Sequence, residues 1–491
     1  MEGDNVVPAV ADNRPLLEEI LASTRLPPSN QDFEAVERGV RAAIGEVVRQ
    51  GSPGAEEHLD NARVDLLIAE IDERISRQID AVLHHPLFQR LEASWRGLKF
   101  LVDRVDYREN VRVELLNCSK DDLLADFEDT PAVVKSGLYK LVYAAEFGVF
   151  GGKPFAAIIS SYEFGPSPQD VVLLQKCAAV AAMAHAPFLA TAGPQFFGLK
   201  EYLNLPHLGE IKALFEGPQY IKYNAFRESE DARYVGLLLP RFLLRLPYGA
   251  ETVRVRAFTY EEDVVGNHAA FLWGPPTYAF ATRLAAAFAR QRWCLNIVGP
   301  NSGGTIDSLV LHEYEAMGAI QTKIPTEVMI TERRESELAE EGFIALTFRK
   351  DTQNACFFSA NSVQKPKFFG ISEEGRQAEL NFKLGTQLPY MFLVSRLAHY
   401  IKVMQREQIG TWKEASDLQA ELNSWLNQYV SDMEVVTPAV RARRPLRKAR
   451  IQVTEVAGNA GWYKVDLDVR PHLKYMGAYF SLSLVGKLDK E

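Results

Sequence analysis

A buried strand, an apolar helix and a second buried strand follow one another in this chain of 491 residues, and this order limits the folds open to it. The runs PFAAIISSYEF (154–164) and PFLATAG (187–193) are apolar enough for strands inside a sheet. Between them, DVVLLQKCAAVAAMAHA (170–186) has a helical pattern. Strand, helix and strand in that order predict a βαβ unit and a partly parallel sheet.

The segments on either side extend an α/β pattern. Apolar runs recur at VGLLLPRFLLRLP (235–247) and CLNIVGP (294–300), and helices are predicted over 276–291 and 388–408. The first hundred residues are mostly helical, with a strong helix over 67–83 and a Gly- and Pro-containing break before it, GSPGAEEH (51–58). The length allows two or three domains.

The C-terminal region differs, because three strands are predicted there, at 447–456, 462–470 and 478–488. Alternation in the second puts Val465, Leu467 and Val469 on one face. A terminal antiparallel meander has at least one free edge, and a free edge can accept a strand from another chain.

A short amphipathic helix is predicted near the start, in RPLLEEILASTRLPP (14–28). Leu16, Leu17, Ile20 and Leu21 share one arc of this helix. An isolated helix of this length is marginal in water, so it needs a groove on its own domain or on a partner. The pattern alone leaves both alternatives open.

Composition excludes several classes of protein. The formal net charge of -9 argues against nucleic acid as the main partner. No run reaches the ~18 apolar residues of a membrane span, and the first residues lack the pattern of a signal peptide. The four cysteines, which form no CxxC pair, are typical of reduced thiols in a cytosol. We therefore expect a cytoplasmic protein without membrane insertion.

No catalytic constellation emerges from the motifs. GPNSGG (299–304) is Gly-rich, but it lacks the lysine and hydroxyl of a phosphate loop, which favours a tight turn. His312 and Glu313 have no second histidine at zinc-protease spacing. The segments 227–236 and 331–342 carry charges of both signs. This mixture is more typical of solvated helix faces or intersubunit ion pairs than of the paired carboxylates of a hydrolase. We expect no catalytic residue, metal or cofactor.

One basic run stands out in this acidic chain. RARRPLRKAR (441–450) holds six basic residues and no acid. Phosphate binding and contact with an acidic protein surface are the two interpretations. The run contains no stacking aromatics, which favours protein contact.

Several long segments resemble the large sheath subunit of bacterial type VI secretion systems, the TssC/VipB family. They are HPLFQRLEASWRGLKFLVDR (85–104), FLLRLPYG (242–249), KIPTEVMITERRESELAEEGFIAL (323–346), LPYMFLVSRLAHYIKVMQREQIG (388–410), RRPLRKARIQV (443–453) and RPHLKYMGAYFSLSLVGKL (470–488). They occur in the order of the family, and the resemblance runs from about Leu16 to Leu488. Ala460 stands where many members carry proline.

The resemblance implies a structural part of a machine. Such a subunit pairs with a small sheath subunit (TssB/VipA type) and polymerises with copies of itself in the cytoplasm, around a tube of Hcp hexamers and on a baseplate. Contraction drives the tube out of the cell, and the AAA+ unfoldase ClpV dismantles the contracted sheath. The expected fold is α/β and tail-sheath-like, with a helical N-terminal region and a C-terminal antiparallel β region completed by neighbouring subunits.

The resemblance also implies domains and contact residues. We expect an exterior helical extension over 1–60, a central α/β domain over 61–380 and an inner C-terminal domain over 381–491. The arc Leu16, Leu17, Ile20 and Leu21 corresponds to the segment that the unfoldase grips. The expected intersubunit contacts are Arg443, Arg444, Arg447, Lys448, Ile451 and Val453. The alternative function is a soluble α/β enzyme with a phosphate-binding loop at 299–304.

Overall fold

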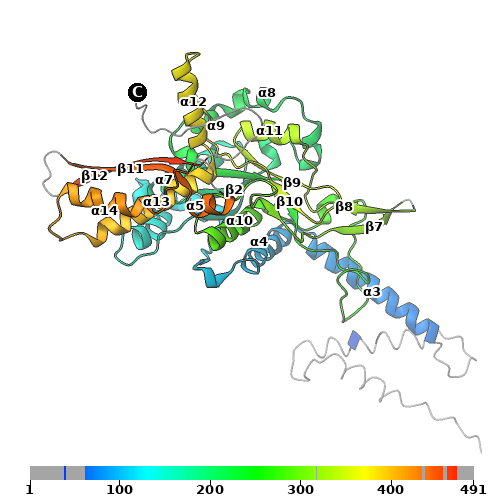
Figure 1. The fold of residues 1–491 in the computed structure, drawn as a ribbon. Coiled ribbons are helices and arrows are strands. Elements are labelled where there is room, and N and C mark those ends of the chain that lie inside the picture. The colour runs from blue at the N-terminus through cyan, green and yellow to red at the C-terminus, as the bar shows by residue number, and fades with distance from the viewer. Residues whose placement is uncertain are drawn as a thin grey trace, which may run out of the picture. The chain divides into compact units, whose positions relative to one another are not determined.

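We describe the chain from a computed structural model, which describes residues 38, 39, 42, 61–316, 318–433, 437–456 and 462–472 (Figure 1). The chain divides into two units. One comprises residues 1–81 with 248–262, and the other comprises 82–247 with 263–491. The amphipathic helix predicted at 14–28 and the strand predicted at 478–488 lie outside the described residues.

The described part of the first unit is built on the helix α3 (Asn61–Leu83), which confirms the helix predicted over 67–83. The segment 248–262 is tied to this helix by two hydrogen bonds. The Tyr260 hydroxyl donates to Oδ1 of Asp80 at 2.6 Å, and the Thr259 N–H donates to Oδ2 of Asp72 at 3.2 Å.

A six-stranded sheet forms the centre of the second unit, in the order β1-β2-β3-β9-β10-β6. The strands are β1 (Ile158–Phe164), β2 (Phe188–Ala192), β3 (Val235–Leu239), β9 (Phe343–Phe348), β10 (Ala355–Phe357) and β6 (Thr305–Ile306). The first four pair in parallel, whereas β10 pairs antiparallel with β9 and with β6. The predicted βαβ unit is confirmed, because β1 and β2 are parallel and α7 (Pro168–Ala184) connects them.

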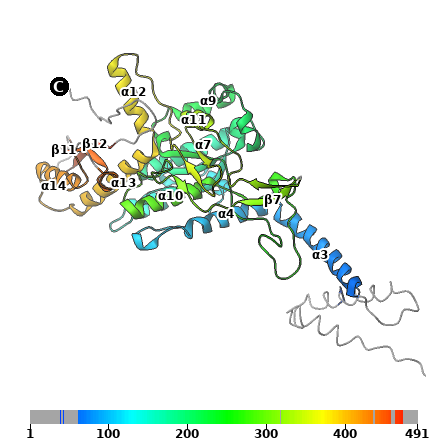
Figure 2. The same ribbon diagram turned by 45° about the vertical axis from the view of Figure 1, so that its right-hand side comes forward.

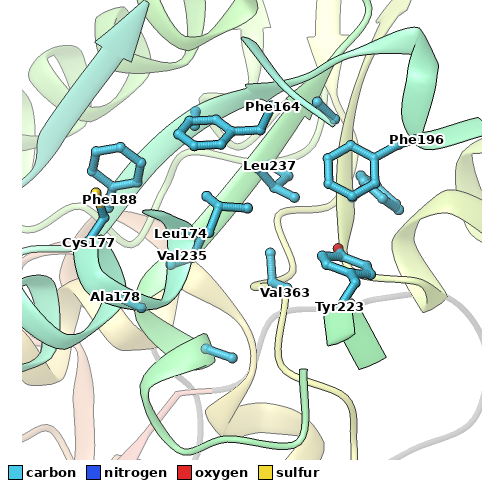
Figure 3. Packing of buried hydrophobic residues seen from close by; sticks show 14 of the residues in the cluster. Phe164, Leu174, Cys177, Ala178, Phe188, Phe196, Tyr223, Val235, Leu237 and Val363 are labelled. Atoms are coloured by element: carbon cyan, nitrogen blue, oxygen red, sulfur yellow. The ribbon is translucent and has the colours of Figure 1, made fainter. Parts of the chain in front are cut away.

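Helices cover both faces of this sheet, which explains why its strands read as nearly continuous apolar runs. On one face, α7 packs against a cluster that includes Phe188 and Leu237 (Figure 3). Phe343 belongs to the same cluster. On the other face, α10 (Pro276–Gln291) and α13 (Leu388–Glu407) pack on the alternate residues, such as Leu189 and Leu238. Side chains of successive strand residues point to opposite faces, so each strand serves both layers.

One apolar run of the sequence does not form a strand. Within CLNIVGP (294–300), Ile297 and Val298 are buried, but the segment has no strand pairing. The reason is that β6, further along the chain, occupies the ladder position beside β10. The run at 235–247 divides at Pro240 into β3 and the short β4 (Phe242–Leu243).

A second core lies under the C-terminal strands. The helix α14 (Ala415–Asn427) and the end of α13 pack against β11 (Leu446–Glu455) and β12 (Tyr463–Pro471) (Figure 1). These two strands pair antiparallel, which confirms the first two strands of the predicted meander. The predicted face of Val465, Leu467 and Val469 packs on this core.

The remaining elements surround these two cores. The helices are α4 (Pro86–Val102), α5 (Lys120–Glu128), α6 (Gly137–Tyr139), α8 (Ile211–Phe215), α9 (Ile221–Arg227), α11 (Glu332–Glu340), α12 (Glu373–Gly385) and α15 (Pro438–Arg443). The short strand β5 (Trp273–Gly274) pairs with β4, and β7 (His312–Ala316) forms a hairpin with β8 (Ala319–Lys323). Figure 2 shows this hairpin and the pair β11–β12 at opposite ends of the unit.

Candidate assembly surfaces

The two edges of the β11–β12 pair are covered differently. On the β11 side, the Asn423 amide accepts from the Ile451 N–H at 2.9 Å and donates to the Ile451 carbonyl at 2.8 Å. Gln419, one turn earlier on α14, accepts from the Val453 N–H at 3.0 Å. Side chains of α14 therefore occupy the hydrogen-bonding positions that a neighbouring strand would take.

The β12 side is the open edge. Residues opposite each other in an antiparallel pair direct their N–H and C=O groups either toward each other or both away. Ile451 and Val453 direct theirs toward α14, so the residues opposite them, Leu467 and Val465, direct theirs away from β11. In the described part of the chain, β12 pairs with β11 alone. This edge can accept one more strand.

Two of the predicted contact residues have buried side chains. The side chains of Ile451 and Val453 are buried in the core that α13 and α14 form with this pair. Alternation of the strand directs them inward, since Arg450 and Gln452 occupy the opposite face. Ile451 and Val453 therefore present no exposed side chain in this chain, and their intersubunit contact stays a prediction.

The basic side chains of the same run are exposed. Arg443 and Arg444 lie at the end of α15, and Arg447 and Lys448 at the start of β11. None of the four forms an ion pair with another described residue. The nearby positive charges of Arg441 and Arg447 add to burial in lowering the pKa of His472. The structure thus brings the run together as one exposed basic patch, 441–448.

The helix α4 carries apolar residues on two different faces. Ala93, Gly97 and Leu101 are buried on one face, where a Cβ on Gly97 would lie 2.4 Å from Cδ2 of Tyr278 on α10. Glycine is therefore needed for the close approach of the two helices. On the other face, five large apolar side chains are exposed, namely Leu87, Phe88, Leu91, Trp95 and Val102.

Four of these residues, Leu87, Phe88, Leu91 and Trp95, follow one another as a stripe, and Val102 lies on the same side two turns later. At about 100° per residue they fall within an arc of roughly 100°, centred about 130° from the buried face. Leu87 is 63% exposed and Trp95 is 61% exposed. Single exposed apolar residues are common, but a contiguous patch marks an interaction site. The exposed residues 87, 91 and 95 and the buried residues 93, 97 and 101 each repeat at intervals of four. These two repeats were the sequence signal for the exposed face, and the sequence analysis did not identify it.

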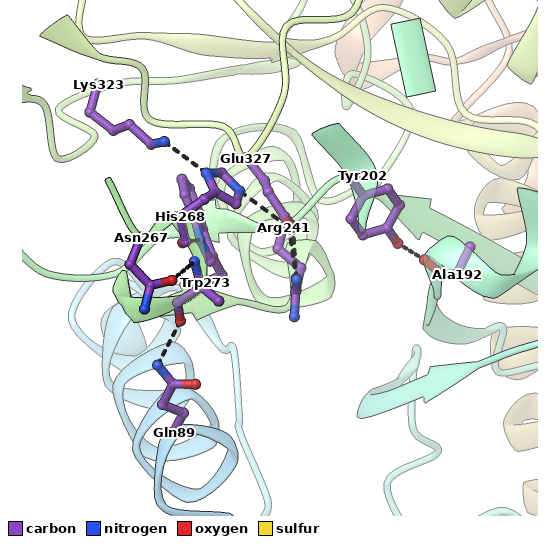
Figure 4. Close-up of polar contacts among 10 residues, drawn as sticks. Gln89, Ala192, Tyr202, Arg241, Asn267, His268, Trp273, Lys323 and Glu327 are labelled. Atoms are coloured by element: carbon purple, nitrogen blue, oxygen red, sulfur yellow. Dashed lines mark hydrogen bonds and ion pairs between the residues drawn. The ribbon is translucent and has the colours of Figure 1, made fainter. Parts of the chain in front are cut away.

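A buried polar network fixes the base of the β7–β8 hairpin (Figure 4). The Arg241 guanidinium donates twice to the carboxylate of Glu327, at 2.8 and 2.7 Å. Nε2 of His268 lies 3.5 Å from the same carboxylate, and Nζ of Lys323 on β8 donates to Nδ1 of His268 at 2.7 Å. Burial opposes ionisation of Glu327, but the hydrogen bonds from Arg241 and His268 lower its pKa overall. This carboxylate is held by structural partners and is unsuited to act as a base.

The Gly-rich segment 299–304 forms the tight turn that the sequence favours. The Gly299 N–H donates to the Phe357 carbonyl, and the Gly304 N–H donates to the Gly299 carbonyl. A Cβ on Gly304 would lie 2.5 Å from the Phe357 oxygen, so this glycine permits close backbone packing. Because these N–H groups are already paired within the chain, they are not available to a phosphate.

Other chemistry also finds little support in the described residues. They contain no cluster of three or more His, Cys, Asp or Glu side chains arranged to hold a metal ion. Burial raises the pKa of all four thiols, in the case of Cys294 to about 12, so they remain protonated and weakly nucleophilic at neutral pH. Among the described helices, none is long and apolar enough to cross a membrane.

Comparison with known proteins gives two family matches. Residues 65–364 match the VipB model, described as EvpB/VC_A0108, tail sheath N-terminal domain. Residues 377–488 match the model described as EvpB/VC_A0108, tail sheath gpW/gp25-like domain. The chain belongs to the VipB family of tail sheath proteins. This confirms the resemblance to the TssC/VipB family.

A curated relative of this VipB chain is the type VI secretion system sheath protein TssC1 of Pseudomonas aeruginosa. It is 37% identical over 468 residues, which cover 94% of this chain and 93% of the relative. The chain is also similar to two solved structures of the anti-feeding prophage. Its baseplate matches with a TM-score of 0.37 and 10% identity over 78% of this chain and 84% of that one. Its contracted helical sheath matches with a TM-score of 0.30 and 11% identity over 66% of this chain and 68% of that one.

Proposed function

We propose that this chain is the large subunit of the contractile sheath of a type VI secretion system. In this role it pairs with a small sheath subunit, and the heterodimers polymerise in the cytoplasm around an Hcp tube. The observation that carries the proposal is the β11–β12 pair, which α14 closes on one edge and which no further strand of the described residues covers on the other. Membership of the VipB family and the named TssC1 relative support it. Its role is structural and not enzymatic.

The open edge of β12 is the position for a strand from a neighbouring subunit. An unpaired edge with alternating apolar residues is an aggregation hazard unless another strand covers it. A strand added there gains main-chain hydrogen bonds to Val465 and Leu467 and extends the apolar face that already packs on α14. Exchange of such strands links successive heterodimers into a polymer.

The exposed stripe of α4 is the surface for the small sheath subunit. Exposing several apolar side chains together costs more free energy of hydration than exposing one. A helix or sheet of the partner covers this face. The basic patch 441–448 contacts acidic surfaces of other subunits in the polymer. These assignments extend the proposed function to named surfaces.

The remaining partners belong to the same proposal. The domain over 381–491 faces the Hcp tube, the domain over 61–380 forms the body of the sheath, and the extension over 1–60 lies outside. The sheath grows from a baseplate. ClpV binds the segment that contains Leu16, Leu17, Ile20 and Leu21, which lies outside the described residues. If contraction exposes this helix, the unfoldase will select the contracted state, since a ligand shifts an equilibrium only toward the state it binds better.

Co-expression with the small subunit tests the function. We expect the chain alone to be insoluble, and the two chains together to form hollow tubular polymers visible by electron microscopy. A soluble, monodisperse single chain that forms no polymer with the small subunit would contradict the proposal.

The β12 edge is tested by two substitutions at one position. Leu467→Pro removes the N–H that points to the open edge, and Leu467→Ala removes a similar part of the side chain but keeps the N–H. We expect heterodimers from both variants and sheaths from Leu467→Ala only. Sheaths of normal length from Leu467→Pro would exclude this edge as the site of strand exchange.

The unfoldase segment is tested with a peptide covering residues 12–28. Ile20→Asp places a charge on the apolar arc, which costs at least a few kcal/mol in an apolar groove, so we expect binding to ClpV to be lost. Glu18→Ala, on the opposite face, is the control and should bind nearly as well as the wild type. Equal affinity of the wild-type and Ile20→Asp peptides would favour a helix docked on its own domain.

A further inference from the structure

An aromatic cavity lies where residues of the two family-matched regions meet in the second unit. It has a volume of about 390 Å³. Phe288 and Trp293, at the end of α10 and just beyond it, belong to the region matched over 65–364. Tyr400 on α13 and Tyr429 after α14 belong to the region matched over 377–488. The volume suits a large side chain together with part of its backbone.

The rim of the cavity is held in an unusual backbone conformation. Asn110 and Arg292 both line it and both have a positive φ, 59° and 67°. Residues other than glycine adopt this conformation rarely, and it persists where surrounding contacts enforce it. Here the Arg292 guanidinium donates to the carbonyl of Glu109 at 2.8 Å and to its carboxylate at 2.7 Å. These contacts fix the segment before Asn110 against the end of α10.

The walls offer hydrogen-bond donors that the chain itself does not use. Trp293 is only 2% exposed, yet its indole N–H donates to no described residue. Arg108, an exposed residue, also lines the cavity, and its guanidinium has no ion pair with a described residue. The indole N–H is not among the buried side-chain atoms that lack a partner in the described residues, so it reaches solvent and can donate to an acceptor from outside.

The charge around the cavity favours an anionic ligand. Arg396 lies behind the aromatic wall, with its guanidinium 4.9 Å from the ring centre of Tyr400 and 5.5 Å from that of Phe288. It occupies these ring faces, which would otherwise attract a cation. The lining itself holds two arginines, Arg108 and Arg292, and one carboxylate, that of Glu109, which pairs with Arg292. The unmatched charge is positive.

We propose that this cavity receives a peptide segment of another sheath subunit, which inserts an apolar side chain between the aromatic rings and places a neighbouring carboxylate on Arg108. The indole N–H of Trp293 donates to a carbonyl or carboxylate oxygen of the segment. The source in another subunit rests on the proposed function, because only a polymer supplies such segments at high local concentration. A segment bound there contacts both family-matched regions at once, and it therefore restrains their arrangement within the sheath.

Photo-crosslinking in assembled sheaths tests the proposal. Tyr429 is replaced by p-benzoyl-phenylalanine, sheaths are formed with the small subunit, and cross-linked products are separated by mass on a denaturing gel and sequenced by mass spectrometry. We expect a product heavier than one chain, joined to a segment with an apolar residue next to Asp or Glu. The same probe at the fully exposed Trp412 is the control for random capture. Cross-links confined to the chain itself, or a segment without that pattern, would overturn the proposal.

Two conservative variants test the donors. Trp293→Phe keeps an aromatic ring but removes the N–H, and Arg108→Gln removes the charge. We expect each to lower the yield of the intersubunit product by about tenfold, as for loss of one charge-assisted or buried hydrogen bond. Arg112→Gln, at an exposed arginine four residues away, should leave the yield unchanged. If Trp293→Phe and Arg108→Gln cross-link like the wild type, the donors do not bind the segment. Normal sheaths without the cross-link would refute this inference alone, whereas absence of sheaths would refute the proposed function.

Discussion

The central sheet and the β11–β12 pair are both built from apolar strands, but they differ in how completely the chain covers them. In the sheet, Leu237 and Phe343 are fully buried and helices lie on both faces. In the pair, Ile451 and Leu467 face a core, while the opposite face carries charged residues such as Arg450 and Asp468. One edge of the pair is closed by amide side chains, and no strand among the described residues covers the other.

This difference separates stability from assembly. A sheet whose strands are buried on both faces contributes most of the apolar burial that holds the unit together. A two-stranded pair is marginal on its own and relies on the helix beneath it. We therefore expect substitutions in the sheet to act on folding, and substitutions on the exposed parts of the pair to act on polymerisation.

The largest effect is expected in the sheet. Phe343→Ala removes a fully buried ring that lies 5.2 Å from Phe197 and 5.5 Å from Phe215 between ring centres. Truncation of a buried phenylalanine costs about 3–5 kcal/mol, so the free energy of unfolding of the heterodimer should fall by that amount. Urea denaturation measures it. A loss below about 1 kcal/mol would show that this core is far less tightly packed than described.

The next effect depends on pH. His399 on α13 is 2% exposed, and its Nε2 lies 2.9 Å from the Ala184 carbonyl. Burial, with smaller contributions from Arg396 and His185, lowers the pKa of His399 to about 4. The neutral imidazole therefore stabilises the fold above the unfolded pKa of about 6.5, and stability declines as the pH falls from there toward 4.

The expected loss between these limits is of order 3 kcal/mol, since each unit of pKa corresponds to about 1.4 kcal/mol. His399→Gln should flatten this part of the pH dependence, and His207→Gln, at an exposed histidine, should not. Urea midpoints measured at pH 7.5 and pH 4.5 compare the three proteins. An unchanged pH dependence in His399→Gln would assign the acid sensitivity to other groups, of which His185 is the first candidate because burial lowers its pKa too.

A smaller effect is expected where the pair meets α14. Asn423→Ala leaves both the N–H and the carbonyl of Ile451 without their partners. Leaving such groups unpaired costs about 1–3 kcal/mol. Urea denaturation should show a loss in that range, and light scattering should show more aggregation, because a second strand edge becomes open. Asn427→Ala, on an exposed position of the same helix, is the matched control. Equal stability of the two variants would mean that water replaces the amide without cost.

The sequence allowed prediction of the strands but not of their edges. Apolar composition and alternation are local, so β1, β2, β11 and β12 were recognised from their own residues. Closure of the β11 edge depends on Asn423 and Gln419, which lie on a helix about one turn apart and look like ordinary surface residues. Their role depends on a tertiary contact that no local pattern records.

The structure places one apolar run and two expected contact residues differently from the sequence analysis, for different reasons. CLNIVGP has the composition of a strand, but β6 takes the place beside β10, and composition does not rank competitors for one ladder position. Ile451 and Val453 were grouped with the basic residues around them because they share a run. Strand alternation directs them to the opposite face, and that consequence was available from the sequence once the strand was predicted.

We expect the smallest effect on stability for substitutions in the basic patch. These substitutions should also separate stability from assembly most clearly. Arg443, Arg444 and Arg447 are exposed and make no ion pair within the described residues. Replacing them with glutamate should change the free energy of unfolding of the heterodimer by no more than about 0.5 kcal/mol, as for surface substitutions generally. The same change places negative charge where the proposed contact needs positive charge, so sheaths should be fewer and shorter.

Salt provides the test of mechanism for this triple variant. The screening length falls from about 10 Å at 0.1 M to about 3 Å at 1 M ionic strength, so the difference between the variant and the wild type should shrink as salt is added. Sheath length and number are measured by electron microscopy across this range, beside urea denaturation of the heterodimer. A charge-matched control replaces Arg112, Lys135 and Lys350 with glutamate, which shifts the net charge equally at exposed positions outside the patch. If both triple variants impair sheaths alike, net charge and not the patch is responsible. If neither does so at low salt, the contact lies elsewhere, and the open edge of β12 carries the assembly without it.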